Sequence, residues 1–208
     1  MTARARRIQP SHLRPDLKVF EDNEIVRAFL SGDEGAFKEL VERYQTHLLG
    51  FVYRAIGDRE RAEDIVQETF LRVYRHIRHF DQTKKFSSWV YTIASNLAKN
   101  ELHDRMLHPS VTFSILDQNR HPDENLFEAR DTKSTPDRAY EKQYAYDLVM
   151  ETVSQLTVDH KIVFTLRELR GLSYEAIGEI IDCPPGTVRS RLSRARAAFK
   201  ALAAHRID

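Results

Sequence analysis

Four arginines fall within eight residues near the end of this 208-residue chain, with no acidic residue among them. They stand in the stretch CPPGTVRSRLSRAR, residues 183–196. Arginine forms two parallel hydrogen bonds with phosphates and with guanine edges, so this cluster predicts contact with a nucleic acid. The alternative is a merely solvated helix face. Such a face usually mixes acidic and basic residues, because pairs four residues apart stabilise a helix, and this stretch contains no such mixture.

The same stretch has the pattern of a helix that begins at the paired prolines, Pro184 and Pro185. Proline suits a first helical turn, because its ring fixes φ and its missing N–H would have no partner there. At 100° per residue the apolar residues fall on one side, flanked by Arg191. The opposite side carries Arg189, Ser190, Ser193 and Arg194. A helix capped by Ser173 and ending near Asp182 precedes the prolines, and the pair predicts a helix-turn-helix whose second helix enters the DNA major groove.

The composition excludes several other classes of protein. There are 32 lysines and arginines against 31 acidic residues. The net charge of +1 gives no general affinity for nucleic acid, so binding must come from local clusters. The single cysteine, Cys183, excludes an intrachain disulfide and fits a reducing compartment. No run reaches the roughly 18 apolar residues that span a bilayer, and no apolar segment follows the basic start. We therefore expect a cytoplasmic protein without membrane insertion.

The remaining sequence predicts an all-α fold of two small helical domains joined by a flexible linker. Residues 1–22 are predicted to be a disordered basic arm. Apolar residues recur at helical spacing through residues 23–105 and predict a four-helix bundle. Residues 106–137 hold three prolines and no periodic apolar face, which is typical of a linker. Helical spacing returns in residues 138–208, which contain the helix-turn-helix.

Two parts of the sequence are similar to a known protein family. The chain closely resembles region 4 of the extracytoplasmic-function (ECF) sigma factors, which recognises the promoter's minus-thirty-five element, in LRELRGLSYEAIGEIIDCPPGTVRSRLSRAR. It resembles region 2 of the same family in AEDIVQETFLRVYRHIRHF and FSSWVYTIASNLAKN. The resemblance covers residues 23–105 and 139–202. Two distinctive blocks in the family's order form a specific match, whereas a lone helix-turn-helix is weak evidence.

The resemblance implies two DNA-binding sites. Region 4 would contact the minus-thirty-five element through Thr187, Arg189, Ser190, Arg191, Ser193 and Arg194. Region 2 would open the minus-ten element and hold an unpaired base through residues 80–100, where cations suit phosphates, aromatic faces suit stacking and amides suit base edges. The candidates are Lys84, Lys85, Phe86, Ser87, Ser88, Tyr91, Asn96, Lys99 and Asn100. The domain core is the alternative for Tyr91 and Trp89 and is favoured for Trp89, while the base pocket is expected at residues 86–88.

Region 2 also implies docking on RNA polymerase. The positions that match the family's contacts with the clamp coiled coil of the β′ subunit are Asp64, Gln67, Glu68 and Leu71. Together with Glu63 they form an acidic, partly apolar patch suited to a basic partner helix. One alternative is that acids in a first helical turn complement the helix dipole. Another is a carboxylate metal site, for which no further residue has convincing ligand spacing.

The remaining expectations also follow from the resemblance. The implied partners are the bacterial RNA polymerase core, through its β′ clamp coiled coil and its β flap, promoter DNA, and an anti-sigma factor. The linker would thread the active-site and RNA-exit path of the polymerase. No cofactor, metal ion or covalent chemistry is expected, so the chain is not predicted to be an enzyme.

Two other functions are alternatives to this interpretation. A stand-alone helix-turn-helix regulator would use the same recognition helix, but it would need dimer symmetry or an effector pocket, and the N-terminal block resembles neither. A metal-dependent nuclease would use Glu63, Asp64 and Glu68 together with His76 and His79. Histidines three residues apart on a helix are more often surface residues than ligands, which disfavours the nuclease.

Overall fold

The computed structural model describes residues 17–107 and 148–204, and all regular secondary structure in these two ranges is helical. The all-α prediction is therefore confirmed. The expected arm up to residue 16 and the expected linker from residue 108 lie outside the described residues. Residues 17–22 belong to the folded part instead, since a 3-10 helix forms at Leu17–Val19 and α1 begins at Asp22. None of the described helices is long and apolar enough to cross a membrane.

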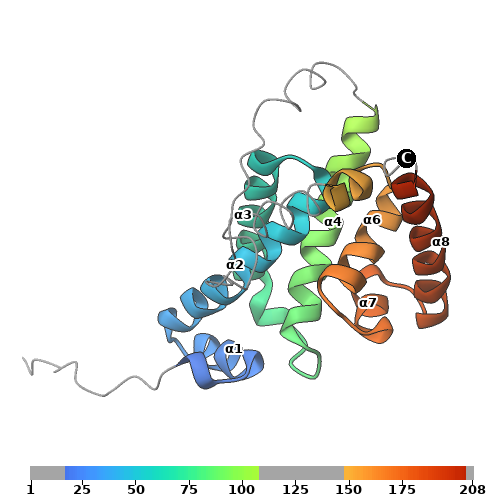
Figure 1. Cartoon of the computed structure of the whole chain (residues 1–208). Coiled ribbons are helices and arrows are strands. Elements are labelled where there is room, and N and C mark those ends of the chain that lie inside the picture. The colour runs from blue at the N-terminus through green and yellow to red at the C-terminus, as the bar shows by residue number, and fades with distance from the viewer. Residues whose placement is uncertain (1–16, 108–147, 205–208) are drawn as a thin grey trace, which may run out of the picture.

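The first group of helices consists of α1 (Asp22–Leu30), α2 (Glu34–Ile56), α3 (Arg59–His76) and α4 (Phe86–Leu107). Within this group α2 contacts each of the other three helices, and α4 lies on the side that faces the later helices of the chain (Figure 1). A 3-10 helix (Ile77–His79) and a loop over residues 80–85 lead from α3 to α4. The apolar residues of each helix turn inward, as their spacing indicated, because burying them removes apolar surface from water.

The ends of these helices follow from local sequence signals. The carboxylate of Asp33 accepts a hydrogen bond from the backbone N–H of Gly35 and caps α2, and Asp58 does the same for the N–H of Arg61 in α3. Gly57 lies between α2 and α3 with φ of 74°, a left-handed conformation that favours glycine. These signals fix the sharp turn that lays α3 beside α2.

The second group of helices contains the predicted helix-turn-helix. Residues 148–154 are helical. They are followed by α6 (Val158–Phe164), a π-helix at Thr165–Leu169, α7 (Tyr174–Ile181) and α8 (Pro185–Ala204). The hydroxyl of Ser173 accepts a hydrogen bond from the N–H of Ala176 at 3.2 Å, so the predicted cap of α7 is confirmed. The recognition helix α8 begins at Pro185, as the paired prolines indicated.

A glycine in α7 permits the tight turn between α7 and α8. The chain reverses through Asp182, which has φ of 52°, and the N–H of Cys183 donates to the carbonyl oxygen of Gly178 at 2.9 Å. A Cβ atom at Gly178 would lie 2.6 Å from the carbonyl oxygen of Cys183. Because that oxygen belongs to the backbone, the turn itself would have to move to make room for any other residue.

The two groups of helices pack against each other and share one apolar core. In Figure 1, α7 lies beside α4, and α6 and the π-helix also contact α2. The shared core includes Phe51 and Val90 from the first group and Ile162, Leu166 and Ile177 from the second. The sequence predicted two domains but did not indicate that they pack together.

One pair of like charges lies where the two groups meet. Lys161 of α6 is half-buried and close enough to Arg105 of α4 that the two cations repel each other. Burial, reinforced by this repulsion, lowers the pKa of Lys161 below its ordinary value. Arg105 is also paired with Asp58 and Glu101, so carboxylates beside it offset its charge.

We predict that Gly178→Ala destabilises the chain by about 1–3 kcal/mol, because the added methyl group overpacks the turn. The measurement is the free energy of unfolding from denaturant titration. Gly186→Ala is the matched control, since Gly186 is also in the helix-turn-helix but a Cβ atom there meets nothing within 4 Å. The control should change stability by less than about 1 kcal/mol. Equal effects of the two substitutions would contradict the steric role of Gly178.

Candidate nucleic-acid interface

One side of α8 is exposed and carries most of the residues predicted to contact the minus-thirty-five element. The exposed residues are Arg189, Ser190, Ser193 and Arg194, and the half-buried ones are Thr187 and Arg191. Val188, Leu192 and Ala195 are buried on the side that packs against α6 and α7. The separation of α8 into a polar and an apolar face is therefore confirmed, while contact with DNA stays a prediction.

Two contacts fix α8 on the helices beneath it. Phe199 stacks on Phe164 of α6, with ring centroids 4.9 Å apart. The guanidinium of Arg196 donates to Oε1 of Glu168 from Nη2 at 2.6 Å and from Nε at 2.9 Å. The helical spacing placed Arg196 beside the apolar stripe, but it did not indicate Glu168 as a partner. In the structure Arg196 anchors α8 to the π-helix.

Tyr174 contributes to this surface and was missed by the sequence analysis. It stands at the start of α7, and its ring centroid lies 5.8 Å from Cζ of Arg189 and 5.0 Å from Cζ of Arg167. A guanidinium at this distance is attracted to the face of an aromatic ring. Tyr174 therefore restrains Arg189, the first arginine of α8. Tyr174 and Arg189 are far enough apart in the sequence that no local pattern indicated the contact.

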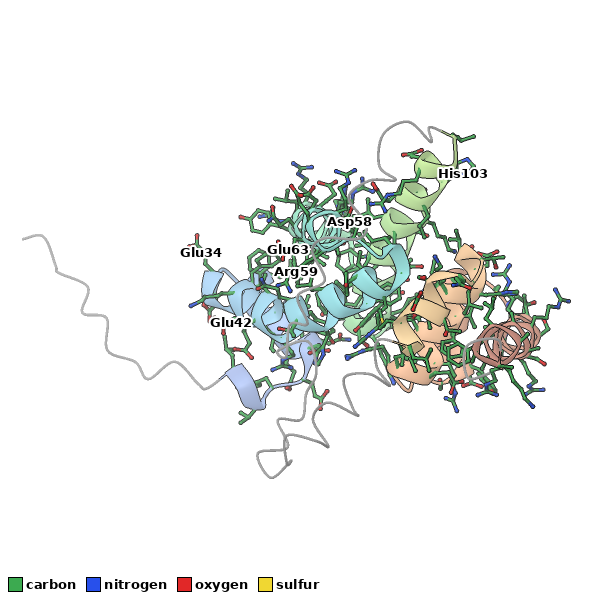
Figure 2. The ribbon with its side chains drawn as sticks, turned by 45° about the horizontal axis from the view of Figure 1, so that its top comes forward. Glu34, Glu42, Asp58, Arg59, Glu63 and His103 are labelled. Atoms are coloured by element: carbon green, nitrogen blue, oxygen red, sulfur yellow. The ribbon has the colours of Figure 1, made fainter. Side chains whose placement is uncertain are left out.

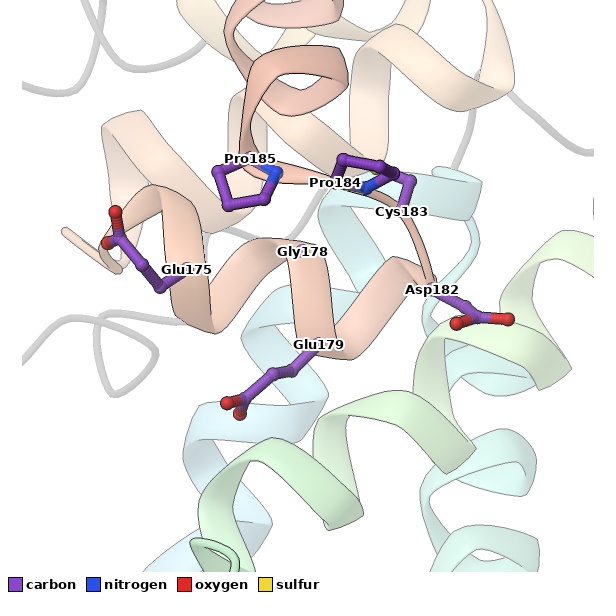
Figure 3. Close-up of a pocket in the computed structure, with 7 residues that line it drawn as sticks. All are labelled: Glu175, Gly178, Glu179, Asp182, Cys183, Pro184 and Pro185. Carbon is purple, nitrogen blue, oxygen red and sulfur yellow. The ribbon is translucent and has the colours of Figure 1, made fainter.

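A hollow of about 460 Å³ between α7 and the first turn of α8 has an acidic lining (Figure 3). Glu175, Glu179 and Asp182 are among its lining residues. In Figure 3 the side chains of Glu179 and Asp182 point away from Pro185. Carboxylates repel phosphates, so this side of the helix-turn-helix is unfavourable for DNA. The arginine-bearing side of α8 is the favourable one.

The structure places the residues of the predicted minus-ten set that are not buried in two groups. The loop group is Lys84, Lys85 and Ser87. The helix group is Asn96, Lys99 and Asn100 on α4. Both lysines of the loop group and both asparagines of the helix group are exposed, while Ser87 and Lys99 are half-buried. At about 1.5 Å per helical residue the two groups lie roughly 15–20 Å apart. A single DNA strand that contacted both the loop group and the helix group would have to run along α4.

Phe86 and Ser88 are buried, which corrects the role expected for Phe86. Its ring is 1% exposed and packs against Tyr44 and Phe80, with centroids 5.4 and 5.9 Å away. Ser88 is 9% exposed. A ring enclosed in this way has no free face on which an unpaired base could stack. Phe86 therefore packs in the core beneath the loop. Of the three residues expected to form the base pocket, only Ser87 is accessible.

The other aromatic residues of α4 are also part of the core. Tyr91 is 4% exposed and packs edge-on against Phe51, with centroids 5.4 Å apart, so its expected contact with DNA is corrected as well. Trp89 stacks on Phe80 at 4.9 Å, in agreement with the core position favoured for it. The sequence could not separate these possibilities, because a ring that packs and a ring that stacks have the same spacing.

A cavity of about 320 Å³ lies beside the loop of residues 80–85. Its lining includes Lys85, Phe86 and Ser87 from the predicted set. It also includes residues at the start of α1, which are Glu21, Asp22 and Asn23. The sequence analysis missed this side of the cavity, because α1 is distant from the loop in the sequence. An ammonium group, a hydroxyl and an amide at one cavity are suited to hydrogen bonding with a polar ligand.

The residues predicted to dock on the polymerase lie in order on one side of α3, at spacings of three and four residues. They are Asp64, Gln67, Glu68 and Leu71. Two of the acids are paired with arginines on the same helix, Asp64 with Arg61 at 3.4 Å and Glu68 with Arg72 at 2.7 Å. These arginines offset much of the negative charge. The face is therefore less acidic than the sequence indicated.

Tyr74 extends this face of α3 and was also missed. Its side chain is 57% exposed, and that of Leu71 is 50% exposed. The ring of Tyr74 contacts Phe37 at 5.1 Å and Phe29 at 5.7 Å between centroids. An exposed aromatic ring with a rigid apolar support is typical of a residue that anchors a protein interface. Its spacing of three residues from Leu71 was the signal that could have identified it.

A network of ion pairs joins α3 to α4. Arg61 donates to both carboxylate oxygens of Glu101, at 3.2 and 2.7 Å. Arg105 donates to Glu101 at 2.8 Å and to Asp58 at 3.1 Å. The hydrogen bond from Arg61 is the main reason that the pKa of Glu101 lies below its usual value. The helix that carries the docking residues is thus held firmly against the helix that carries the asparagines.

The acids considered for a metal-dependent nuclease do not converge on one point. Glu63 is paired with Arg59 at 3.0 Å, and Figure 2 shows the two side chains near Asp58 at the start of α3. The rings of His76 and His79 have centroids 6.5 Å apart. Within residues 17–107 and 148–204, no group of three or more His, Cys, Asp or Glu side chains could hold a metal ion. The geometry gives the nuclease interpretation no ligand set.

These observations define a class of protein. A helix-turn-helix with an arginine-bearing exposed face and a helical bundle with a cationic loop indicate an all-α DNA-binding protein with two different modules. The family model for Sigma-70 region 2 matches residues 40–106, and the model for Sigma-70, region 4 matches residues 146–199. The region 2 match begins within α2 and runs almost to the end of α4, leaving out α1, and the region 4 match covers most of the second group.

Curated relatives match over most of their length. The chain is 38% identical over 187 residues to the RNA polymerase sigma-H factor of Pseudomonas aeruginosa, covering 88% of this chain and 94% of the relative. It is 39% identical over 175 residues to the ECF RNA polymerase sigma-E factor of Haemophilus influenzae, covering 84% and 91%. The chain therefore belongs to the sigma-70 family of RNA polymerase sigma factors, in its ECF group.

Solved structures show the same fold. The structure of CnrH in complex with the cytosolic domain of CnrY is similar with a TM-score of 0.60 at 22% identity, over 87% of this chain and 96% of that one. The sigma factor RpoE in complex with the anti-sigma factor NepR, from Bartonella quintana, is similar with a TM-score of 0.60 at 24% identity, over 80% and 95%.

We predict that Arg194→Ala weakens binding to the minus-thirty-five sequence by about 1–3 kcal/mol, because an arginine that reads base edges is lost. The measurement is the affinity of the polymerase complex for promoter duplexes with the native and a scrambled minus-thirty-five sequence. Lys200→Ala is the control, since Lys200 is exposed further along α8. An equal loss on both duplexes would show that Arg194 contacts phosphate and would contradict base reading.

Proposed function

We propose that this protein is an alternative sigma factor, which binds core RNA polymerase and directs it to a particular set of promoters. The observation that carries this function is the presence of regions 2 and 4 in one chain, in the family's order, with close relatives named as sigma factors. Sigma factors are transcription initiation factors, and we expect this chain to perform no covalent chemistry itself. Because it is proposed to bind RNA polymerase, we expect the protein to act in the cytoplasm.

Region 4 reads the minus-thirty-five element through α8. The exposed arginines Arg189 and Arg194 have the donor geometry that recognises guanine in the major groove, and the serines beside them suit phosphate contacts. Tyr174 restrains Arg189, and Arg196 fixes the helix from below. This support lowers the freedom that the arginine side chains lose on binding, which favours affinity.

Region 2 opens the minus-ten element and holds its non-template strand. Lys84 and Lys85 attract the phosphates, Ser87 and the cavity beside it accept an unpaired base, and Asn96, Lys99 and Asn100 extend the contact along α4. The exposure of these side chains supports the assignment. The buried rings of Phe86 and Tyr91 supply rigidity to this surface.

Reading both elements at once requires the two groups of helices to separate. Elements centred about 25 base pairs apart lie roughly 85 Å apart on B-form DNA, at about 3.4 Å per base pair. A compact chain of the size described here has a radius of gyration of about 15 Å. We propose that core polymerase opens the packing of α4 on α7 by binding the separated form more tightly.

The partners follow from the same assignment. The face of α3 with Leu71 and Tyr74 docks on the clamp coiled coil of the β′ subunit, and region 4 contacts the β flap. Because a similar sigma factor was solved with an anti-sigma factor, we propose that such a regulator also holds this chain inactive. A stand-alone regulator is the alternative, and it would bind its DNA site without polymerase.

The proposed function predicts that the purified chain, mixed with bacterial core polymerase, starts transcription from a subset of a promoter library. The measurement is sequencing of the transcripts made in vitro. Core polymerase alone is the control and should give only background initiation. If the chain directs no initiation, yet protects a DNA site by itself, it is a stand-alone regulator and the proposal is wrong.

Replacing the docking residues should separate polymerase binding from folding. The double variant Asp64→Ala with Gln67→Ala should lower the affinity for core polymerase by about five- to thirtyfold, a cost of about 1–2 kcal/mol for lost interface contacts. Its melting temperature should stay close to that of the wild type, because both side chains are exposed. Glu42→Ala is the matched acidic control on α2. Unchanged polymerase affinity in the double variant would refute the docking assignment.

A further inference from the structure

The loop that carries Lys84 and Lys85 is held in a defined shape. Within the loop, the carboxylate of Asp81 accepts hydrogen bonds from the backbone N–H of Thr83 at 3.0 Å and from its hydroxyl at 2.7 Å. The N–H of Lys84 donates to the carbonyl oxygen of Asp81 at 3.0 Å. The hydrogen bonds from Thr83 hold the pKa of Asp81 below its ordinary value, because they stabilise the charged carboxylate.

Asn23 of α1 bonds to this loop from outside it. Its side-chain nitrogen Nδ2 donates to the carbonyl oxygen of Gln82 at 3.0 Å and to that of Lys84 at 2.9 Å. An amide nitrogen has two hydrogens, and two loop carbonyls accept them. The loop backbone is therefore connected to a helix about 60 residues earlier in the sequence.

The start of α1 is itself anchored on α2. Asp22 accepts a hydrogen bond from Arg43 at 2.8 Å and another from the hydroxyl of Tyr44. Arg43 also donates to the carbonyl oxygen of Phe20 at 3.0 Å. Burial, together with Asp22, raises the pKa of Tyr44 above its usual value, so the hydroxyl keeps its proton and donates. Asn23 is thus attached to a rigid part of the bundle.

The same network supports the first residue of α4. The ring of Tyr44 packs edge-on against Phe86 at 5.4 Å between centroids. Asn23, Lys85, Phe86 and Ser87 all line the cavity of about 320 Å³. The shape of this cavity and the direction in which the two lysines leave the loop therefore depend on one set of contacts around the start of α1.

We propose that Asn23 is a positioning residue for promoter melting. It holds the loop of residues 80–85 in the shape that captures the displaced non-template strand. The proposal rests on the proposed function of this loop. A loop that is already ordered loses less conformational freedom when a DNA strand binds. The two hydrogen bonds from Asn23 therefore increase the affinity for the strand, although Asn23 itself does not contact DNA. The lysines then meet the phosphates, and the cavity stays open to an unpaired base.

The test uses the full chain bound to core polymerase and the variants Asn23→Ala and Asn23→Asp. The probe is a fluorescent single-stranded oligonucleotide with the non-template minus-ten sequence of a promoter that the wild type uses. We expect Asn23→Ala to weaken its binding about tenfold, since two hydrogen bonds that order the loop are lost. Asn23→Asp should weaken it further, because a carboxylate would face two carbonyl oxygens. Hydrogen exchange of the loop amides should be faster in both variants.

Ser31→Ala is the matched control, because Ser31 also bonds from its side chain to a backbone carbonyl of α1, that of Arg27, but at the opposite end of the helix. It should bind the oligonucleotide like the wild type. The Asn23 variants should keep wild-type affinity for core polymerase and for a minus-thirty-five duplex. A parallel loss of all three affinities would show a general structural role and would overturn the positioning role.

Two further outcomes separate this inference from the function on which it rests. If the Asn23 variants bind the oligonucleotide as tightly as the wild type, the positioning role is wrong while the sigma-factor function stands. If the wild-type complex itself does not prefer the minus-ten strand over a scrambled strand, the function proposed for the loop is wrong, and the role of Asn23 falls with it.

Discussion

The central constraint on this molecule is the position of α4, which packs against helices of both groups and also exposes residues for DNA. Its small buried residues, Ala94, Ser95 and Ala98, leave room for other backbones to approach closely. Asn96 and Asn100, in the same stretch of α4, remain exposed. One helix therefore belongs to region 2, contacts region 4, and carries the asparagines for which we propose contact with a single DNA strand. A change on α4 that alters its packing is expected to alter this exposed side as well.

The packing of region 4 on region 2 links structure to regulation. In the compact arrangement both DNA-binding faces are present on a chain too small to reach both promoter elements. The apolar contacts between α4 and α7 favour this arrangement. A partner that binds the separated form better can open it, which is the role we propose for core polymerase.

Periodicity in the sequence was sufficient to predict the helices, the cap at Ser173 and the two faces of α8, because these features depend on residues within one or two turns. It could not predict features that depend on tertiary contacts. Phe86 has the spacing of a stacking residue but is enclosed by rings from α2 and from the segment before α4. Helical spacing places Arg196 at the edge of the apolar face but cannot name Glu168 as its partner, and Asn23 contacts the loop only in the folded chain.

The most direct test of this account is a distance between the two groups of helices. Spin labels at Lys38 of α2 and Lys200 of α8, both exposed, in a Cys183→Ala background would report it by pulsed electron resonance. We expect a single distance in the free chain, set by the packing of α4 on α7, and a much longer one in complex with core polymerase and promoter DNA. The same distance in both states would contradict the proposed separation.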